Sequence, residues 1–120
     1  MRPPRRILAV LESRPSDEDV VRRAAEVAVA GGGYLTLVAV VPRPFPFANA
    51  TPYCYPRVTR DELRRDAQAA LTRATALVPA DVPVRTHVGE GRPRAVVARY
   101  AKDAACDLVV TRRTLIPKEA

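Results

Sequence analysis

Four short apolar runs, separated by longer segments of helical periodicity, dominate this sequence of 120 residues. The runs at 7–11, 34–41 and 107–110 are nearly continuous in apolar residues, which is typical of strands covered on both faces. The run at 84–88 alternates apolar with polar residues, as a strand at a sheet edge does. Strands alternating with helices predict an α/β fold, an open parallel sheet with helices on both faces and right-handed crossovers.

The segments between the runs carry helix signals. Ser16 is a good N-cap, and the acidic residues 17–19 that follow it suit the positive end of a helix dipole. Three glycines at 31–33 end this first helix. Pro93 fits the first turn of the third helix. The second helix has an apolar stripe at helical spacing, formed by Leu63, Ala67, Ala70, Leu71, Ala74 and Leu77.

A chain of this length fits one domain, so we expect residues 1–120 to form a single α/β domain. Its core is predicted at 5–111, with a proline-rich loop at 42–58 and a short C-terminal tail at 112–120. No apolar run approaches the roughly 20 residues of a membrane span. The apolar run after the basic start is too short for a signal peptide. We therefore expect a cytoplasmic protein with no membrane partner.

Composition argues against several function classes. The net charge is +7, but the arginines are scattered over three predicted helices, so we do not expect nucleic acid as a partner. Cys54, Cys106 and the single histidine, His87, have neither disulfide-framework nor metal-ligand spacing. No nucleophile–histidine–acid arrangement and no pair of catalytic carboxylates can be read from the sequence. We predict no metal, no catalytic residue and no enzyme activity.

Three segments together resemble the universal stress protein family over roughly residues 5–111. The segment ILAVLES, at 7–13, looks like the family's first strand, with Glu12 where an aspartate is usual. The segment GGGYLTLVAVV, at 31–41, resembles its small-residue turn and second strand. The segment at 88–110 is the most specific, because it carries the family's Gly-x-Pro turn as Gly91-Arg92-Pro93 and ends in an Ala-Asp-strand pattern.

The resemblance implies the parallel strand order 3-2-1-4-5, a nucleotide site in many members and dimerisation through the last strand. ATP-binding members carry a glycine-rich loop after the fourth strand, where backbone amides approach the phosphates. Here Thr111, Arg112, Arg113 and Thr114 follow Val110, and no glycine follows Gly91. We therefore expect the order 3-2-1-4 with the fourth helix and fifth strand missing. We expect no cofactor, ATP or AMP being the alternative.

The missing elements are expected to leave one face of the sheet half covered, and an uncovered apolar edge usually marks an interface. The residues predicted to contact another subunit are Leu108, Val109, Val110, Leu115 and Ile116. The partner is then a second copy of the chain or another protein of the universal stress type. The alternative is that the proline-rich loop folds back over this face.

Ligands of open α/β sheets bind where the strand order reverses, here between strands one and four. Glu12, Ser13, Arg14, Arg112 and Arg113 are expected to cluster there, and the arginines would hold an anion through their side chains. The competing interpretation, which we favour, is a solvated loop cluster in which Glu12 pairs with an arginine.

The sequence thus favours a small, non-enzymatic protein that acts through dimerisation or protein contacts and does not bind ATP in the family manner. A role in stress-related regulation is what the resemblance alone implies. The alternative is a nucleotide- or anion-binding sensor that uses the cleft between strands one and four. A third reading, a weak nucleic-acid binder, rests on the net charge alone.

Overall fold

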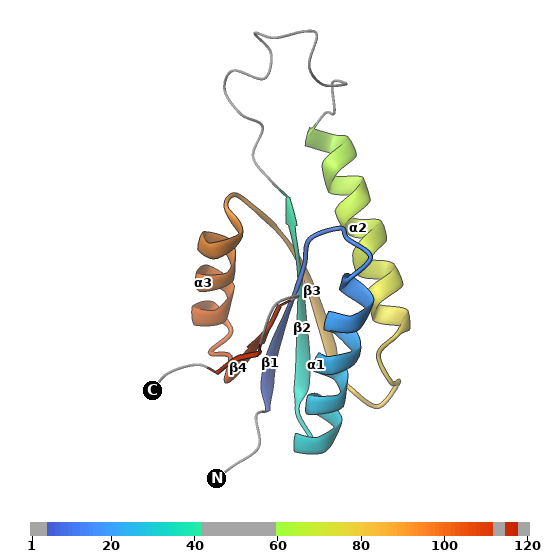
Figure 1. Ribbon diagram of the computed structural model, residues 1–120, viewed down its shortest axis with the longest axis vertical. Coiled ribbons are helices and arrows are strands. Elements are labelled where there is room, and N and C mark those ends of the chain that lie inside the picture. Colours follow the sequence, from blue (N-terminus) through green and yellow to red (C-terminus); the bar gives the residue numbers. More distant parts are fainter. Residues whose placement is uncertain (1–4, 42–59, 112–114, 118–120) are drawn as a thin grey trace, which may run out of the picture.

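A sheet with helices on both faces organises the chain (Figure 1). The computed structural model describes residues 5–41, 60–111 and 115–117. The elements in chain order are β1 (Arg6–Leu11), α1 (Asp17–Gly31), β2 (Tyr34–Val41), α2 (Arg60–Ala76), β3 (Val84–Glu90), α3 (Pro93–Asp103), β4 (Leu108–Val110) and β5 (Leu115–Pro117). None of the helices in these ranges is long and apolar enough to cross a membrane.

The sheet has the order β3-β2-β1-β4-β5. β1 pairs in parallel with β2 and with β4, and β2 pairs in parallel with β3. The predicted parallel order 3-2-1-4 is therefore confirmed. The alternating run at 84–88 lies in β3 at the edge of the sheet, as its pattern predicts.

The structure adds a short strand beyond this prediction. β5 pairs antiparallel with β4, with Val109 opposite Ile116 and Val110 opposite Leu115. Only residues 111–114 separate the two strands. That length is sufficient for a hairpin, whereas a parallel crossover needs a dozen residues or more. β4 is thus paired on both sides, and β5 forms this edge of the sheet.

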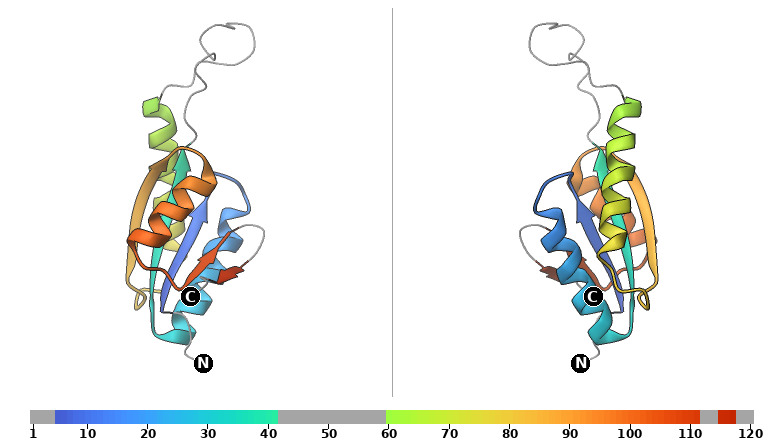
Figure 2. Two further views of the ribbon diagram at one scale, coloured as in Figure 1. Left: turned by 90° about the vertical axis from the view of Figure 1, so that its left-hand side faces the viewer. Right: turned by 90° about the vertical axis from the view of Figure 1, so that its right-hand side faces the viewer.

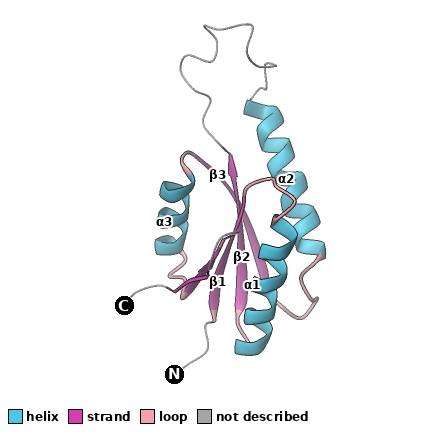
Figure 3. Cartoon of the chain, viewed as in Figure 1, coloured by secondary structure: helices cyan, strands magenta, loops and turns pink. Residues whose placement is uncertain are grey.

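Two layers of helices cover the two faces, with α1 and α2 on one side and α3 on the other (Figures 2 and 3). Alternate residues of each central strand enter different cores. Ile7, Ala9 and Leu11 of β1 pack with the α1 and α2 layer, whereas Leu8 and Val10 pack with α3. Because both faces are covered, β1 needs apolar residues at every position, which explains its continuous run.

Small residues set the distance between the layers. The buried positions of α2 are mostly alanines, namely Ala67, Ala70, Leu71 and Ala74. On the opposite face, α3 lies directly on Gly89, where an added Cβ would come within 2.5 Å of Val96 Cγ1 and 3.0 Å of Tyr100 Cε2. The close approach of α3 to the end of β3 therefore requires a residue without a side chain.

The expected apolar patch over β4 is absent from the single chain. Leu108, Val109 and Val110 are only 7%, 6% and 0% exposed. Val109 joins the α3-side cluster, which includes Val96, and the other two side chains join the α1 and α2 layer. The expectation that these three side chains are exposed is wrong, because α3 and the turn after it cover Val109 on one face and the α1 and α2 layer covers Leu108 and Val110 on the other. The contact of this strand with another subunit stays a prediction. The proline-rich loop at 42–58 lies outside the described residues.

A single carboxylate joins the start of β1 to the start of β4. Asp107 Oδ2 accepts hydrogen bonds from the backbone N–H of Arg5 at 3.2 Å and of Arg6 at 3.0 Å. The Asp107 N–H in turn donates to the Arg6 carbonyl at 2.7 Å. The aspartate that precedes β4 therefore satisfies two backbone N–H groups at the start of the neighbouring strand, β1.

Gly89→Ala is expected to lower the free energy of unfolding by about 1–3 kcal/mol, because its new methyl group overlaps Val96 in a packed layer. Urea unfolding followed by circular dichroism measures this loss. Gly32→Asn is the control: Gly32 has φ 61°, which asparagine tolerates, and nothing lies within 4 Å of its Cβ position. Equal stabilities of Gly89→Ala and the wild type would contradict the close contact.

Asp107→Ala is expected to cost about 1–2 kcal/mol, since two backbone donors lose a charged acceptor at a partly hydrated site. Asp107→Asn should restore part of the loss, because its amide oxygen still accepts. Thermal unfolding compares both with Asp103→Ala, an exposed carboxylate at the end of α3. Equal losses of stability in Asp107→Ala and Asp103→Ala would contradict a stabilising contribution from the Asp107 hydrogen bonds.

Candidate functional site

The loop from β1 to α1 lies at the carboxyl ends of the strands and is held by Asp17. The two carboxylate oxygens of Asp17 accept hydrogen bonds from the backbone N–H of Glu12 at 3.1 Å and of Arg14 at 3.2 Å. Between these two amides, Ser13 has a left-handed φ of 58°, a conformation that costs energy in a residue other than glycine. The amides that could approach an anion here are therefore already bound to a carboxylate.

The capping of α1 differs from the sequence-based expectation. Ser16 occupies the N-cap position but makes no side-chain hydrogen bond to the helix. Asp17, one residue later, instead turns its carboxylate back to the preceding loop. The sequence placed the start of the helix correctly but assigned its polar contact to the wrong neighbour.

The five predicted ligand residues are only partly described. Glu12 is half-buried, and Ser13 and Arg14 are exposed in the loop. Arg112 and Arg113 lie outside the described residues, so their position beside Glu12 stays a prediction. Ser13 and Arg14 line a hollow of about 410 Å³ that opens between the loop, α1 and α2. This hollow lies on the α1 and α2 side of the sheet and is distinct from the predicted cleft between strands one and four.

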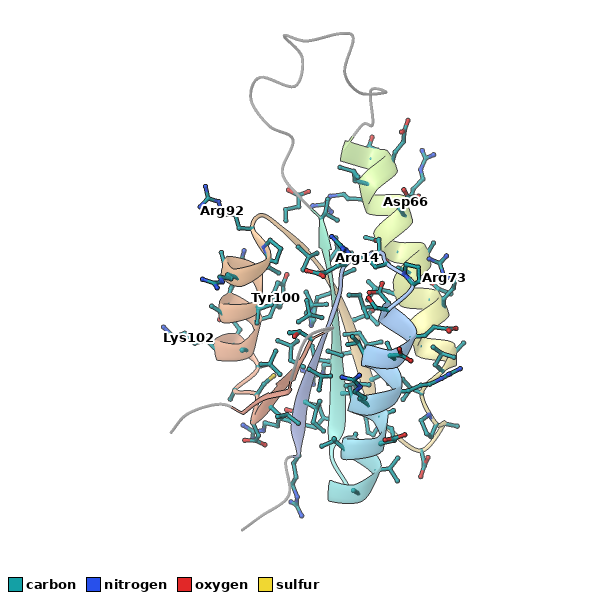
Figure 4. The ribbon with its side chains drawn as sticks, in the orientation of Figure 1. Arg14, Asp66, Arg73, Arg92, Tyr100 and Lys102 are labelled. Carbon is teal, nitrogen blue, oxygen red and sulfur yellow. The ribbon has the colours of Figure 1, made fainter. Side chains whose placement is uncertain are left out.

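Arg73 of α2 lines the same hollow as Arg14, and sequence reasoning did not select it. Figure 4 labels both residues, Arg14 on the loop above α1 and Arg73 on α2. Arg73 follows Ala70 by three residues, so the helical period places both on one side of α2, and Leu77 follows directly after the end of the helix. This spacing was a usable signal, but only the fold brings the opposite wall of the hollow next to it.

The hollow beside Arg14 and Arg73 also has apolar lining residues. Val21, Ala70, Ala74 and Leu77 supply apolar lining. Within the described ranges, neither the Arg14 nor the Arg73 guanidinium has an ion pair or hydrogen bond. Asp17 and Glu18 also line the hollow, but the Asp17 carboxylate is engaged by the loop amides.

A second hollow of about 400 Å³ lies next to the first, and Leu77 lines both. Its lining is mostly apolar and includes Ala25, Val29, Ala30 and Pro79. Val29 is 53% exposed, and no other large hydrophobic residue with a described side chain is exposed. We call the two hollows together the α1–α2 groove, with an arginine end at Arg14 and Arg73 and a valine end at Val29.

The nucleophile and imidazole candidates in the described part of the chain are placed away from each other. The His87 ring packs on the Tyr100 ring, with centroids 5.2 Å apart, and Tyr100 Oη donates to the Val88 carbonyl at 3.4 Å. Cys106 is 1% exposed. Among the residues described, no group of histidines, cysteines and acids has the arrangement of a metal site. Cys54 lies outside those residues.

The family model described as "Universal stress protein family" matches residues 3–114 of this chain. A search of curated proteins gave no significant match.

Solved structures give the same architecture. A protein from the universal stress protein family of Burkholderia pseudomallei superimposes with a TM-score of 0.72 at 22% identity, covering 88% of this chain and 78% of that one. The universal stress protein UspA from Lactobacillus plantarum gives 0.61 at 20% identity, covering 92% and 77%. A universal stress protein solved in complex with cAMP gives 0.56 at 17% identity, covering 88% and 70%. The structures share the fold, and the family model spans almost the whole sequence: this chain belongs to the universal stress protein family.

Proposed function

We propose that this chain is a non-enzymatic regulatory member of the family, located in the cytoplasm, which acts through contacts with a second copy or with another universal stress protein. It does not bind ATP in the family manner. The observation that carries the proposal is the state of the β1–α1 loop, whose Glu12 and Arg14 amides are occupied by Asp17. A phosphate is held by free backbone amides. Residues 111–120 contain no glycine, so their side chains would obstruct the close approach of backbone amides to a phosphate.

The proposed contact is an extension of the sheet through β5. This strand is the last in the sheet order, so its outer side is an unpaired edge within the described part of the chain. An edge strand can pair with its own copy across a two-fold axis, which uses the same residues on both subunits. Leu115 and Ile116 carry the backbone N–H groups of β5 and direct them to opposite edges, whereas Pro117 has no N–H.

The surroundings of the reactive side chains support a role without catalysis. A catalytic thiol is accessible and lies beside a base, whereas Cys106 is buried between α3 and β4. His87 packs on Tyr100, which in turn lies against the Arg99 guanidinium, 5.8 Å from the ring centroid. This arrangement orients aromatic and basic groups for packing.

The second candidate is a nucleotide- or anion-binding sensor. The structural neighbour solved with cAMP favours it. The pairing of β1 with β4 favours it as well, because ligands bind where the strand order reverses. In this candidate Glu12, Ser13 and Arg14 would act with Arg112 and Arg113, and ATP or AMP would be the ligand.

The leading proposal expects that ATP, AMP and cAMP at about 1 mM do not raise the thermal unfolding midpoint. A ligand present at about 100 times its Kd would stabilise the fold by about 2.7 kcal/mol. A saturable rise that disappears in Arg112→Ala/Arg113→Ala but persists in Arg92→Ala/Arg94→Ala would establish the sensor instead. The second pair removes equal charge from the exposed start of α3.

Light scattering after size exclusion is expected to give a dimer at about 50 µM, in the usual micromolar range for a specific interface. Leu115→Lys/Ile116→Lys should give a monomer with unchanged helix content, since charges on an edge strand oppose pairing. Val29→Lys, an exposed position on α1, should leave the dimer intact. A wild-type monomer, or a dimer lost only in Val29→Lys, would refute the β5 interface.

A further inference from the structure

The α1–α2 groove has two chemically different ends. Its first hollow contains the Arg14 and Arg73 guanidinium groups, and its second contains Val29 and Ala30. Leu77 lines both hollows and is the residue that joins them. A groove with cations at one end and aliphatic side chains at the other matches a ligand that is itself anionic at one end and apolar along its length.

Small residues leave the space in this groove unfilled. On the α2 side the first hollow is lined by Ala70 and Ala74, and on the α1 side the second is lined by Ala25 and Ala30. Each hollow, at about 400 Å³, falls within the range of roughly 300–1,000 Å³ that is typical of small-molecule sites. Both hollows are open to solvent, so a ligand would lie along the helices and would not be enclosed.

Backbone contacts fix the segment that carries Arg14 at the arginine end of the groove. The Asp17 carboxylate fixes the Glu12 and Arg14 amides, and Ser13 takes a left-handed conformation between them. The loop is thus tied to the first residue of α1. Arg73 lies on a helix whose Ala70 and Ala74 are buried in the core. Both cations accordingly project from fixed backbone, and neither has a partner within the described ranges.

We propose that this groove binds an aliphatic carboxylate, a free fatty acid of medium length. Its carboxylate lies at Arg14 and Arg73, and its hydrocarbon chain runs along Leu77 to Val29. Guanidinium groups bind carboxylates through paired, charge-assisted hydrogen bonds. Burial of the chain adds the hydrophobic contribution. The site is separate from the β5 edge. It shares Ser13 and Arg14 with the second candidate function but adds Arg73 and an apolar lining on the α1 and α2 side, so it goes beyond the function proposed above.

A protein helix is the rival occupant, and the polar residues of the groove oppose it. Arg22 and Glu26 line the second hollow beside Val29. A docked helix would desolvate both charged groups, which is costly unless each finds a partner. A single hydrocarbon chain is narrow enough to lie on the apolar lining while these side chains keep their charged ends in water.

Substitution of Glu18 tests whether the ligand carries a negative charge. Its exposed carboxylate lines the same hollow as the two arginines and repels an anionic ligand. Glu18→Gln is therefore expected to tighten carboxylate binding, and Arg14→Gln/Arg73→Gln is expected to weaken it by about tenfold or more. A ligand held by another part of the chain would respond to neither change.

Isothermal titration calorimetry of the 120-residue chain with hexanoate, octanoate and decanoate, below their micelle concentrations, tests the proposal. Each added methylene should tighten binding by about twofold or more. Decyltrimethylammonium, with the same chain and the opposite charge, should not bind. Arg92→Gln/Arg94→Gln on α3 is the matched control for lost net charge and should bind as the wild type does.

Val29→Glu tests the valine end without touching the core, because this side chain is exposed. It should weaken decanoate binding more than hexanoate binding. Equal weakening for both lengths, equal effects of the two arginine pairs, or no binding of decanoate would overturn the proposal. Binding only to anionic phospholipid vesicles or to an acidic helical peptide would overturn it too, because each names a different occupant.

Discussion

The burial of β1 on both faces is the constraint on which the rest of the structure depends. Ile7, Leu8, Ala9 and Leu11 are 0% exposed and Val10 is 4% exposed. The strand is also hydrogen-bonded along both edges, to β2 and to β4. A strand that is covered on both faces and hydrogen-bonded along both edges needs apolar side chains at its buried positions. The same contacts fix the position of its carboxyl end, where the β1–α1 loop begins. The position of this loop determines where Asp17 contacts the Glu12 and Arg14 amides and where Arg14 lines the arginine end of the groove.

The sequence predicted the strands best where the pattern of apolar residues directly reflects which faces of the strand are buried. The apolar runs of β1 and β2 and the alternating run of β3 each indicate the number of covered faces, and the structure agrees at all three. β5 could not be predicted, because the pairing of Ile116 with Val109 depends on a reversal that no strong turn residue announces. The exposed patch over β4 was wrong for a related reason, since the cover over Val109 comes from α3 and only the fold brings it there.

The polar contacts of the candidate site could not be predicted from the sequence either. Ser16 and Asp17 are both good residues for the start of a helix, and composition does not tell which one satisfies the loop amides. Arg14 and Arg73 are far apart in sequence and line one hollow because the right-handed crossovers place α1 and α2 on the same face. Ser13 and Arg14, which the sequence assigned to a site at the end of β1, thus line a hollow on the helical layer.

The two cores are unequal. Strands β1 and β2 share a large cluster with α1 and α2, whereas α3 contributes a single fully buried side chain, Val96, to the smaller one. Helices with few buried contacts detach in partial unfolding events well before the whole domain melts. When α3 lifts away, Leu8, Val10 and Val38 become wet while the rest of the sheet stays intact. Opening of α3 alone is therefore expected to expose apolar side chains of the central strands, and self-association through non-native contacts would begin at that face.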